Sequence, residues 1–402
     1  MNRSSHAEKK ENLSRTQIAD RFLCRPVFGI PFFFAVLSLV FFLSFGGIGN
    51  AIERVLYALL LRYGNAAAIA MIRLGVSDLA VRYLIDGIYG AFASAVAFLP
   101  QTVIFFLLIR VLDDCGYLSR AIFVTDRFFR VFGLSGKAVI PLILGYGCAV
   151  SSVCVCDCEN EHENAVLCAL PFIPCNARLP VLLFLADSFF PNGKILFAVF
   201  ILALSLALVF LSLVTASCRK QIRLLPPISL PKYRLPEPRR LIREITDKSR
   251  EYIIRALFAV LLCSAVFSAL AMLTPSLRPT EDVTQSVLYL TAERISVIFR
   301  PLGFGRGEMA AALIFGFFAK ENMVCIFRLL TKNDLSSLLT PAAAVSFTAF
   351  SMFYAPCASL LLTVSRKGKM KRALTLLFRT FAVAYTLSLI LHALFLIIWK
   401  HC

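Results

Sequence analysis

The sequence predicts an all-α, polytopic membrane protein with about 8–11 membrane segments, arranged as two repeats of inverted topology with broken helices. Hydrophobic residues make up 59% of the 402 residues and charged residues only 16%, which is too little polar surface for water-soluble domains of this length. The apolar residues come in runs of about 20, the length that crosses the hydrocarbon core of a bilayer. Basic residues gather in the short segments between the runs.

Nine apolar runs follow one another along the chain. The first, residues 28–48, carries no charge, is longer than a signal-peptide core and lacks a convincing cleavage site, so we expect a retained transmembrane anchor. The other runs lie near residues 88–109, 138–156, 166–190, 195–216, 253–273, 309–327, 342–364 and 373–399.

The basic, proline-containing stretch at residues 218–250 divides these runs into two halves. Its composition favours an extended cytoplasmic linker. We expect five segments in order. They are a cytoplasmic N-terminal segment (residues 1–27), the anchor (28–48), a first half (49–217), the linker (218–250) and a second half (251–402).

Positive charge sets the expected orientation. The N-terminal segment, the linker and the basic cluster at residues 366–372 should all be cytoplasmic. Nine crossings would put the linker outside. We therefore expect residues 114–133 and 285–304 to change sides as well, which makes the two repeats oppositely oriented. The acidic and basic residues of 114–133 make it a poor lipid-facing span, so packing within the protein is the alternative.

The charge and the cysteines exclude several other classes. The net charge of +18 lies in loops and not on one folded face, so no nucleic-acid partner is expected. Many of the 13 cysteines lie in apolar runs, which favours buried, reduced thiols over a disulfide framework. Residues 133–138 lack the spacing of a phosphate-binding loop. We expect no enzyme domain.

The two halves resemble each other weakly. Residues 136–148 can be laid over residues 307–319, and 172–175 over 354–357. Hydrophobic segments interrupted by Gly or Pro at matching places in two halves are typical of transporters whose broken helices meet at a central site.

Candidate site residues lie at these interruptions. Gly145 and Gly147 weaken helix continuity, so freed carbonyls and the thiol of Cys148 could bind a cation; close helix packing is the alternative. Cys175, Asn176 and Arg178 stand among three prolines in an apolar stretch, which indicates an interior cavity or a structural partner for the arginine.

The second half offers a similar set. Lys320 and Glu321 form an ionisable pair between two apolar runs, and Glu321 could supply a hard oxygen ligand to a divalent cation. A structural ion pair is the alternative. Cys357 follows a proline and is either a ligand or a small packing residue. A further cluster around Cys154, Cys156 and Cys158 lacks the spacing of a zinc site, and its role stays open.

Eight short stretches, in order, resemble the membrane region of ferrous iron transport protein B, the FeoB family. They are Phe98–Gln101, Leu112–Ala121, Gly133–Lys137, Gly145–Cys148, Pro174–Pro180, Leu230–Pro236, Ala319–Glu321 and Tyr354–Cys357.

The resemblance implies uptake of Fe²⁺ across the cytoplasmic membrane of a bacterium, through two Gate repeats. Cys148, Cys175, Cys357 and Glu321 match the family's intramembrane positions and would be the metal ligands. Gly145, Gly147, Asn176, Arg178 and Lys320 would line the path. Fe²⁺ would be the substrate, with no resident cofactor.

Two departures from the family pattern follow. The family's GTPase domain is not in this sequence, so we expect a separate GTPase or a small cytoplasmic Feo-type protein as a partner. Ser151 stands where the family favours proline. The alternatives are a Gate transporter of another divalent metal or a nucleoside-like solute, and a non-transporting membrane scaffold. Assembly into a homo-oligomer stays open.

Overall fold

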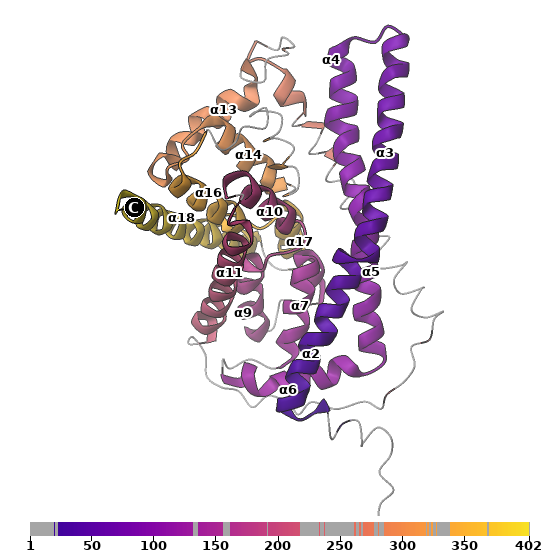
Figure 1. Ribbon diagram of the computed structural model, residues 1–402, viewed down its shortest axis with the longest axis vertical. Coiled ribbons are helices and arrows are strands. Elements are labelled where there is room, and N and C mark those ends of the chain that lie inside the picture. The colour runs from indigo at the N-terminus through magenta and orange to yellow at the C-terminus, as the bar shows by residue number, and fades with distance from the viewer. Residues whose placement is uncertain are drawn as a thin grey trace, which may run out of the picture.

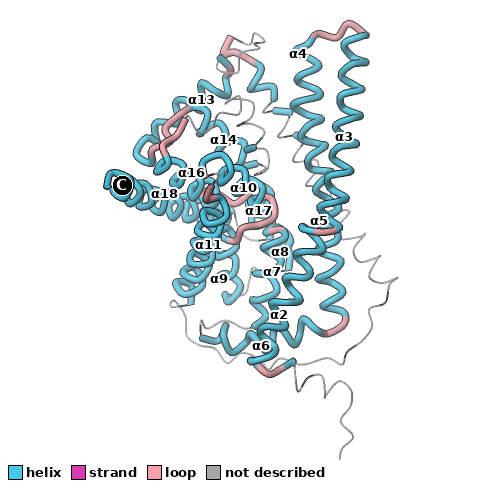
Figure 2. The backbone as a smooth tube through the Cα atoms, in the orientation of Figure 1, coloured by secondary structure: helices cyan, strands magenta, loops and turns pink. Residues whose placement is uncertain are grey.

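The computed structural model describes residues 20, 23–131, 136–155, 161–190, 192–217, 233, 237, 261–262, 265–266, 268–276, 280, 285–318, 320, 323–324, 327, 338–367 and 370–401. Nearly all of these residues are helical, as Figure 2 shows. Five stretches are long and apolar enough to cross a membrane, which confirms a polytopic all-α membrane protein: Val27–Arg73, Arg82–Asp114, Lys194–Thr215, Pro341–Lys367 and Met370–Ile397.

The first half begins with a long helical arm. The elements α2 (Pro26–Phe41), η1 (Phe42–Gly46) and α3 (Ile48–Arg73) run upward in Figure 1, and the chain returns through α4 (Asp78–Val81), η2 (Arg82–Tyr89) and α5 (Gly90–Asp114). α3 and α5 pack side by side. The hydroxyl of Tyr89 donates to the carbonyl of Leu60 at 2.7 Å. The predicted anchor, residues 28–48, is thus continuous with a second helix.

Helix α6 (Tyr117–Val131) lies across the lower end of this arm in Figure 1 and contacts α2 and α5. It is not among the helices long and apolar enough to span a membrane. The described residues 117–131 therefore form a helix packed against the bundle, which is the alternative to the crossing expected for residues 114–133. Its charged residues are accommodated there, since Asp126 accepts a hydrogen bond from the backbone N–H of Gly136 at 2.7 Å.

The next segments of the first half are short. They are η3 (Gly136–Ala138), α7 (Val139–Gly147), α8 (Ala149–Val155), α9 (Glu161–Ala169), η4 (Leu170–Phe172) and α10 (Arg178–Phe189). The long apolar helix α11 (Lys194–Ser217) packs against α9 and α10. The apolar runs at 138–156 and 166–190 are therefore broken, and neither is a continuous span.

The described part of the second half contains α13 (Val287–Ser296), η6 (Val297–Leu302), α14 (Gly307–Phe318), α16 (Pro341–Phe353), α17 (Ala358–Lys367) and α18 (Met370–His401). α13 leads into α14 from the upper end in Figure 1, whereas α6 leads into α7 from the lower end. This arrangement is compatible with the inverted topology of the two repeats, which stays a prediction of the sequence.

Aromatic side chains hold the second half together. All residues of α16 from Ala342 to Phe353 are buried, and α16 packs against α18. The ring of Phe304 lies 5.2 Å from that of Phe347 and 5.6 Å from that of Phe350, centroid to centroid. The same apolar cluster includes Leu182 and Leu185 of α10, so one core joins both halves.

Three separate segments meet at Arg120 of α6, which is only 1% exposed. Its Nε donates to Asp20 of the N-terminal segment at 2.7 Å, and its guanidinium lies 3.7 Å from the ring centroid of Tyr233, in the linker. Burial raises the pKa of Tyr117 beside it to about 12. Asp20 and Tyr233, one from each of two basic segments, therefore lie at the same end of the described structure.

Candidate functional site

The first interruption is at Cys148, between α7 and α8. Cys148 has an extended backbone, with φ −152° and ψ 121°, so the helix stops at Gly147. The hydroxyl of Ser152 donates to the carbonyl of Pro141, which folds α8 back along α7. Cys148 therefore stands at the tip of a helical hairpin that starts and returns on the α6 side.

The second interruption runs through residues 173–177, between η4 and α10. Ile173 is extended, with ψ 127°, and Pro174 cannot donate to a helical ladder. The N–H of Arg178 donates to the carbonyl of Cys175 at 2.9 Å, which starts α10. Cys175 and Asn176 are therefore held in a non-helical turn between two helices.

The third interruption runs from Tyr354 to Cys357, between α16 and α17. The backbone N–H groups of Leu360 and Leu361 donate to the carbonyl of Cys357 at 3.0 and 3.2 Å. Cys357 thus caps α17, in the same position relative to a proline as Cys175. The sequence correspondence of 172–175 with 354–357 is matched by two equivalent helix breaks.

Arg178 joins the second and third interruptions. Its Nη1 donates to the carbonyls of Pro171 and Ile173, and its Nη2 donates to the carbonyl of Ala355 at 3.4 Å. The side chain is 4% exposed. Arg178 therefore acts as the structural partner that was one of its two predicted roles. It donates hydrogen bonds to backbone carbonyls that the broken helices leave without a helical N–H.

The three cysteines lie in one neighbourhood. Cys357 is within electrostatic range of both Cys148 and Cys175. Cys148 and Cys357 also pack against the same apolar cluster, formed by residues such as Val150, Leu170 and Leu360. In the described part of the chain, however, no three His, Cys, Asp or Glu side chains stand close enough to hold a metal ion.

The predicted acidic ligand, Glu321, lies outside the described residues, and so do Cys156 and Cys158. The proposed four-residue ligand set therefore remains a prediction of the sequence. Three of its members are described, and Cys357 lies within electrostatic range of the other two.

Lys320 is buried at 3% exposure beside the third interruption. Its Nζ donates to the carbonyl of Ser351 at 3.2 Å and lies 3.7 Å from the ring centroid of Tyr354. The hydroxyl of Tyr354 donates to the carbonyl of Leu313 on α14. Lys320 thus ties the end of α14 to α16 through the contacts of its Nζ with a carbonyl and an aromatic ring.

Gly145 and Gly147 allow close packing. A Cβ on Gly147 would lie 2.3 Å from a ring carbon of Phe105, and one on Gly145 would lie 3.0 Å from Cδ1 of Ile173. Both glycines therefore permit close packing, which was the alternative to a cation site at this interruption. Whether their carbonyls also line a path stays a prediction.

Three polar residues that sequence reasoning left without a role lie beside the site. Tyr354 contacts Lys320, Gln101 accepts a hydrogen bond from the Nδ2 of Asn176 at 3.1 Å, and Glu53 accepts one from Gln101. Tyr354 and Gln101 stood inside stretches that carry the family resemblance. No local pattern singled out Glu53.

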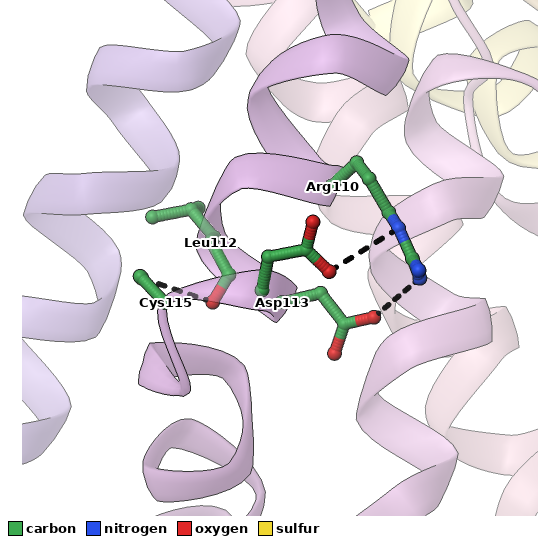
Figure 3. A network of polar contacts seen from close by, with 5 residues as sticks. Arg110, Leu112, Asp113 and Cys115 are labelled. Carbon is green, nitrogen blue, oxygen red and sulfur yellow. Dashed lines mark hydrogen bonds and ion pairs between the residues drawn. The ribbon is translucent and has the colours of Figure 1, made fainter. Parts of the chain in front are cut away.

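The end of α5 carries a charged network in another of these stretches, shown in Figure 3. Arg110 pairs with Asp113 at 2.9 Å and with Asp114 at 3.5 Å. The thiol of Cys115 donates to the carbonyl of Leu112 at 3.3 Å. Carboxylates at a helix C-terminus oppose the helix dipole, so Arg110 offsets a local cost where α5 turns into α6.

Comparison with known proteins agrees with this geometry. The Gate family, described as "Nucleoside recognition", matches residues 95–189, which contain the first two interruptions. The Fe(2+) transporter FeoB of Staphylococcus aureus strain COL is 29% identical over 360 residues, covering 87% of this chain and 54% of the relative.

The chain is similar to FeoB over most of its length. FeoB of Campylobacter jejuni is 29% identical, covering 95% of this chain and 66% of the relative, and FeoB of Helicobacter pylori strain J99 is 28% identical, covering 96% and 67%. The chain thus spans about half the length of the first FeoB relatives it matches. No solved structure matches it.

Proposed function

We propose that this chain is a membrane permease for ferrous iron. The observation that carries the proposal is that a cysteine stands at each of three helix interruptions, with Cys357 within electrostatic range of the other two, in a chain similar to Fe(2+) transporters. Fe²⁺ is a borderline cation that accepts both thiolate and oxygen ligands. Broken helices would provide both, because they leave backbone carbonyls next to the thiols.

The proposal includes the location and the partners. The chain would sit in the cytoplasmic membrane of a bacterium with its N-terminus in the cytoplasm, because the basic segments are retained there. A separate GTPase or a small Feo-type protein would act at the end where Asp20, Arg120 and Tyr233 meet.

The test is uptake into liposomes that contain the purified chain, kept anaerobic, with Fe²⁺, Mn²⁺, Zn²⁺ and nucleosides offered separately. We expect saturable Fe²⁺ entry above that of empty liposomes, and no entry of nucleosides. Entry of a nucleoside without Fe²⁺ would establish the alternative, which the description of the Gate family favours. A chain that admits none of these solutes would be a scaffold.

A further inference from the structure

Three polar side chains from separate parts of the first half form a continuous hydrogen-bonded chain. Gln101 of α5 donates through Nε2 to a carboxylate oxygen of Glu53 on α3. The carbonyl oxygen of Gln101 accepts from the side-chain Nδ2 of Asn176 at 3.1 Å. Asn176 follows Cys175 directly in the second interruption, so the chain links a carboxylate to the candidate cation path.

This arrangement is buried and closely packed. Gln101 is 4% exposed and Asn176 is 7% exposed. Gly49, one helical turn before Glu53, has no room for a side chain, because a Cβ there would lie 1.7 Å from the carbonyl oxygen of Ser44 and 3.3 Å from Cγ of Gln101. Glu53 lies within the apolar stretch Val27–Arg73. An acidic residue in such a stretch is costly in a membrane unless it has a partner or a function.

Charge balance gives Glu53 a reason to be there. Arg178 brings a buried guanidinium, 4% exposed, to the interruptions. Its described hydrogen-bond partners are the backbone carbonyls of Pro171, Ile173 and Ala355. A divalent cation entering beside it would be repelled. Glu53 is the carboxylate that the described hydrogen bonds connect to this neighbourhood.

The direction of these hydrogen bonds determines how the negative charge of Glu53 would affect the amide oxygens of Gln101 and Asn176. Each amide donates an N–H toward Glu53, and such donation polarises the amide so that its own carbonyl oxygen becomes more negative. The last group of the chain is Oδ1 of Asn176. An amide oxygen polarised by a carboxylate is a better ligand for a divalent cation than an isolated amide.

We propose that Glu53, Gln101 and Asn176 form a relay that adds an oxygen subsite for a divalent first-row transition-metal cation beside Cys175. Asn176 supplies the oxygen, while Gln101 and Glu53 are positioning residues that polarise it. This inference rests on the proposed function, because it requires a cation path, and it brings α3, which lies before the matched Gate residues, into that path.

The first measurement is the concentration dependence of Fe²⁺ uptake in proteoliposomes. Glu53→Gln keeps the length of the side chain and removes its charge. We expect the half-saturating concentration to rise about tenfold or more, the usual effect of losing a hydrogen bond to a charged group, with the maximal rate changed less than about twofold. Gln101→Met, which cannot form the hydrogen bonds, should have the same effect.

The control is Glu293→Gln, an exposed carboxylate on α13, which should leave both constants unchanged. The double variant Glu53→Gln, Asn176→Ala should have the same half-saturating Fe²⁺ concentration as Asn176→Ala alone, because the two residues act through one oxygen. The relay would be overturned if Glu53→Gln left the half-saturating Fe²⁺ concentration unchanged. It would also be overturned if the increases caused by Glu53→Gln and Asn176→Ala multiplied in the double variant.

The second measurement separates the relay from the proposed function. Co²⁺ is titrated into the detergent-purified protein, and the absorption band of thiolate-bound Co²⁺ is followed. If Fe²⁺ uptake is absent but Co²⁺ binds about tenfold more weakly to Glu53→Gln than to the unchanged protein, the permease proposal fails and the relay stands. Equal Co²⁺ affinity, or no Co²⁺ binding by the unchanged protein, overturns the relay.

Discussion

Arg178 donates a hydrogen bond at 3.4 Å to the carbonyl of Ala355, which lies 177 positions later in the chain. The same guanidinium holds the carbonyls of Pro171 and Ile173. One buried side chain therefore fixes the two proline-containing helix breaks relative to each other. The cysteines that follow the two prolines are positioned by this bond.

Replacement of Arg178 by lysine should loosen both interruptions. Lysine keeps the charge but has no planar fork that can reach both segments, so at least one buried carbonyl loses its partner, at a cost of about 1–3 kcal/mol. We expect a lower unfolding temperature in detergent and slower Fe²⁺ uptake. Arg62→Lys, at an exposed position on α3, is the control. An Arg178→Lys protein that unfolds like the unchanged one would show that the bridge is dispensable.

Gly147→Ala should destabilise the hairpin tip that carries Cys148. The added Cβ would lie 2.3 Å from the ring of Phe105, so side chains must shift, at a cost of about 1–3 kcal/mol. The measurement is thermal unfolding, and Phe105→Leu in the same chain should recover part of the loss. Gly193→Ala has no atom within 4 Å of its Cβ and should be neutral. Equal stability of the two alanine variants would refute the packing.

Tyr354→Phe removes the hydroxyl that donates to Leu313 and keeps the ring beside Lys320. The carbonyl of Leu313 loses a hydrogen bond, and we expect a loss of about 1 kcal/mol in the free energy of unfolding. Tyr63→Phe, at an exposed position on α3, should be without effect. A loss in Tyr63→Phe as large as in Tyr354→Phe would mean that the bond to Leu313 contributes nothing.

The contact between the N-terminal segment and α6 can be followed through Cys24. Burial, and then the charge of Asp20, raises the pKa of the Cys24 thiol, so less thiolate is present at neutral pH and alkylation should be slow. Asp20→Asn removes that charge and the ion pair with Arg120. We expect faster reaction with N-ethylmaleimide, measured by mass spectrometry of the peptide containing Cys24.

Asp187→Asn is the matched control for this experiment, because it breaks an exposed pair with Lys194. It should leave the alkylation of Cys24 unchanged. If Asp20→Asn also leaves it unchanged, the N-terminal segment is not held by Arg120 in solution.

The helix breaks could be predicted from the sequence because their cause is local. Gly147, Pro174 and Pro356 weaken or prevent a helical ladder wherever they stand, and the matching order of the two halves follows from the same residues. The fold class needed only composition and run length.

The remaining features depend on contacts between distant segments. The charged residues of 114–133 argued against a span, but only the packing of α6 against α2 and α5 decided between the alternatives. Glu53 stands in an ordinary helix, and its link to Asn176 exists only because α3 and α5 pack together. The docking of Tyr233 on Arg120 joins a linker to a helix more than a hundred residues earlier, which no periodicity encodes.

The most direct test of the cysteine path is the initial rate of Fe²⁺ entry into proteoliposomes for Cys148→Ser, Cys175→Ser and Cys357→Ser, with Cys168→Ser as the control. Cys168 is a free thiol in the last turn of α9, within a helix and not at one of the three breaks. We predict that each of the three variants loses most of the uptake while Cys168→Ser retains it. Uptake that is unchanged in all three, or lost equally in Cys168→Ser, would contradict a metal path through the interrupted helices.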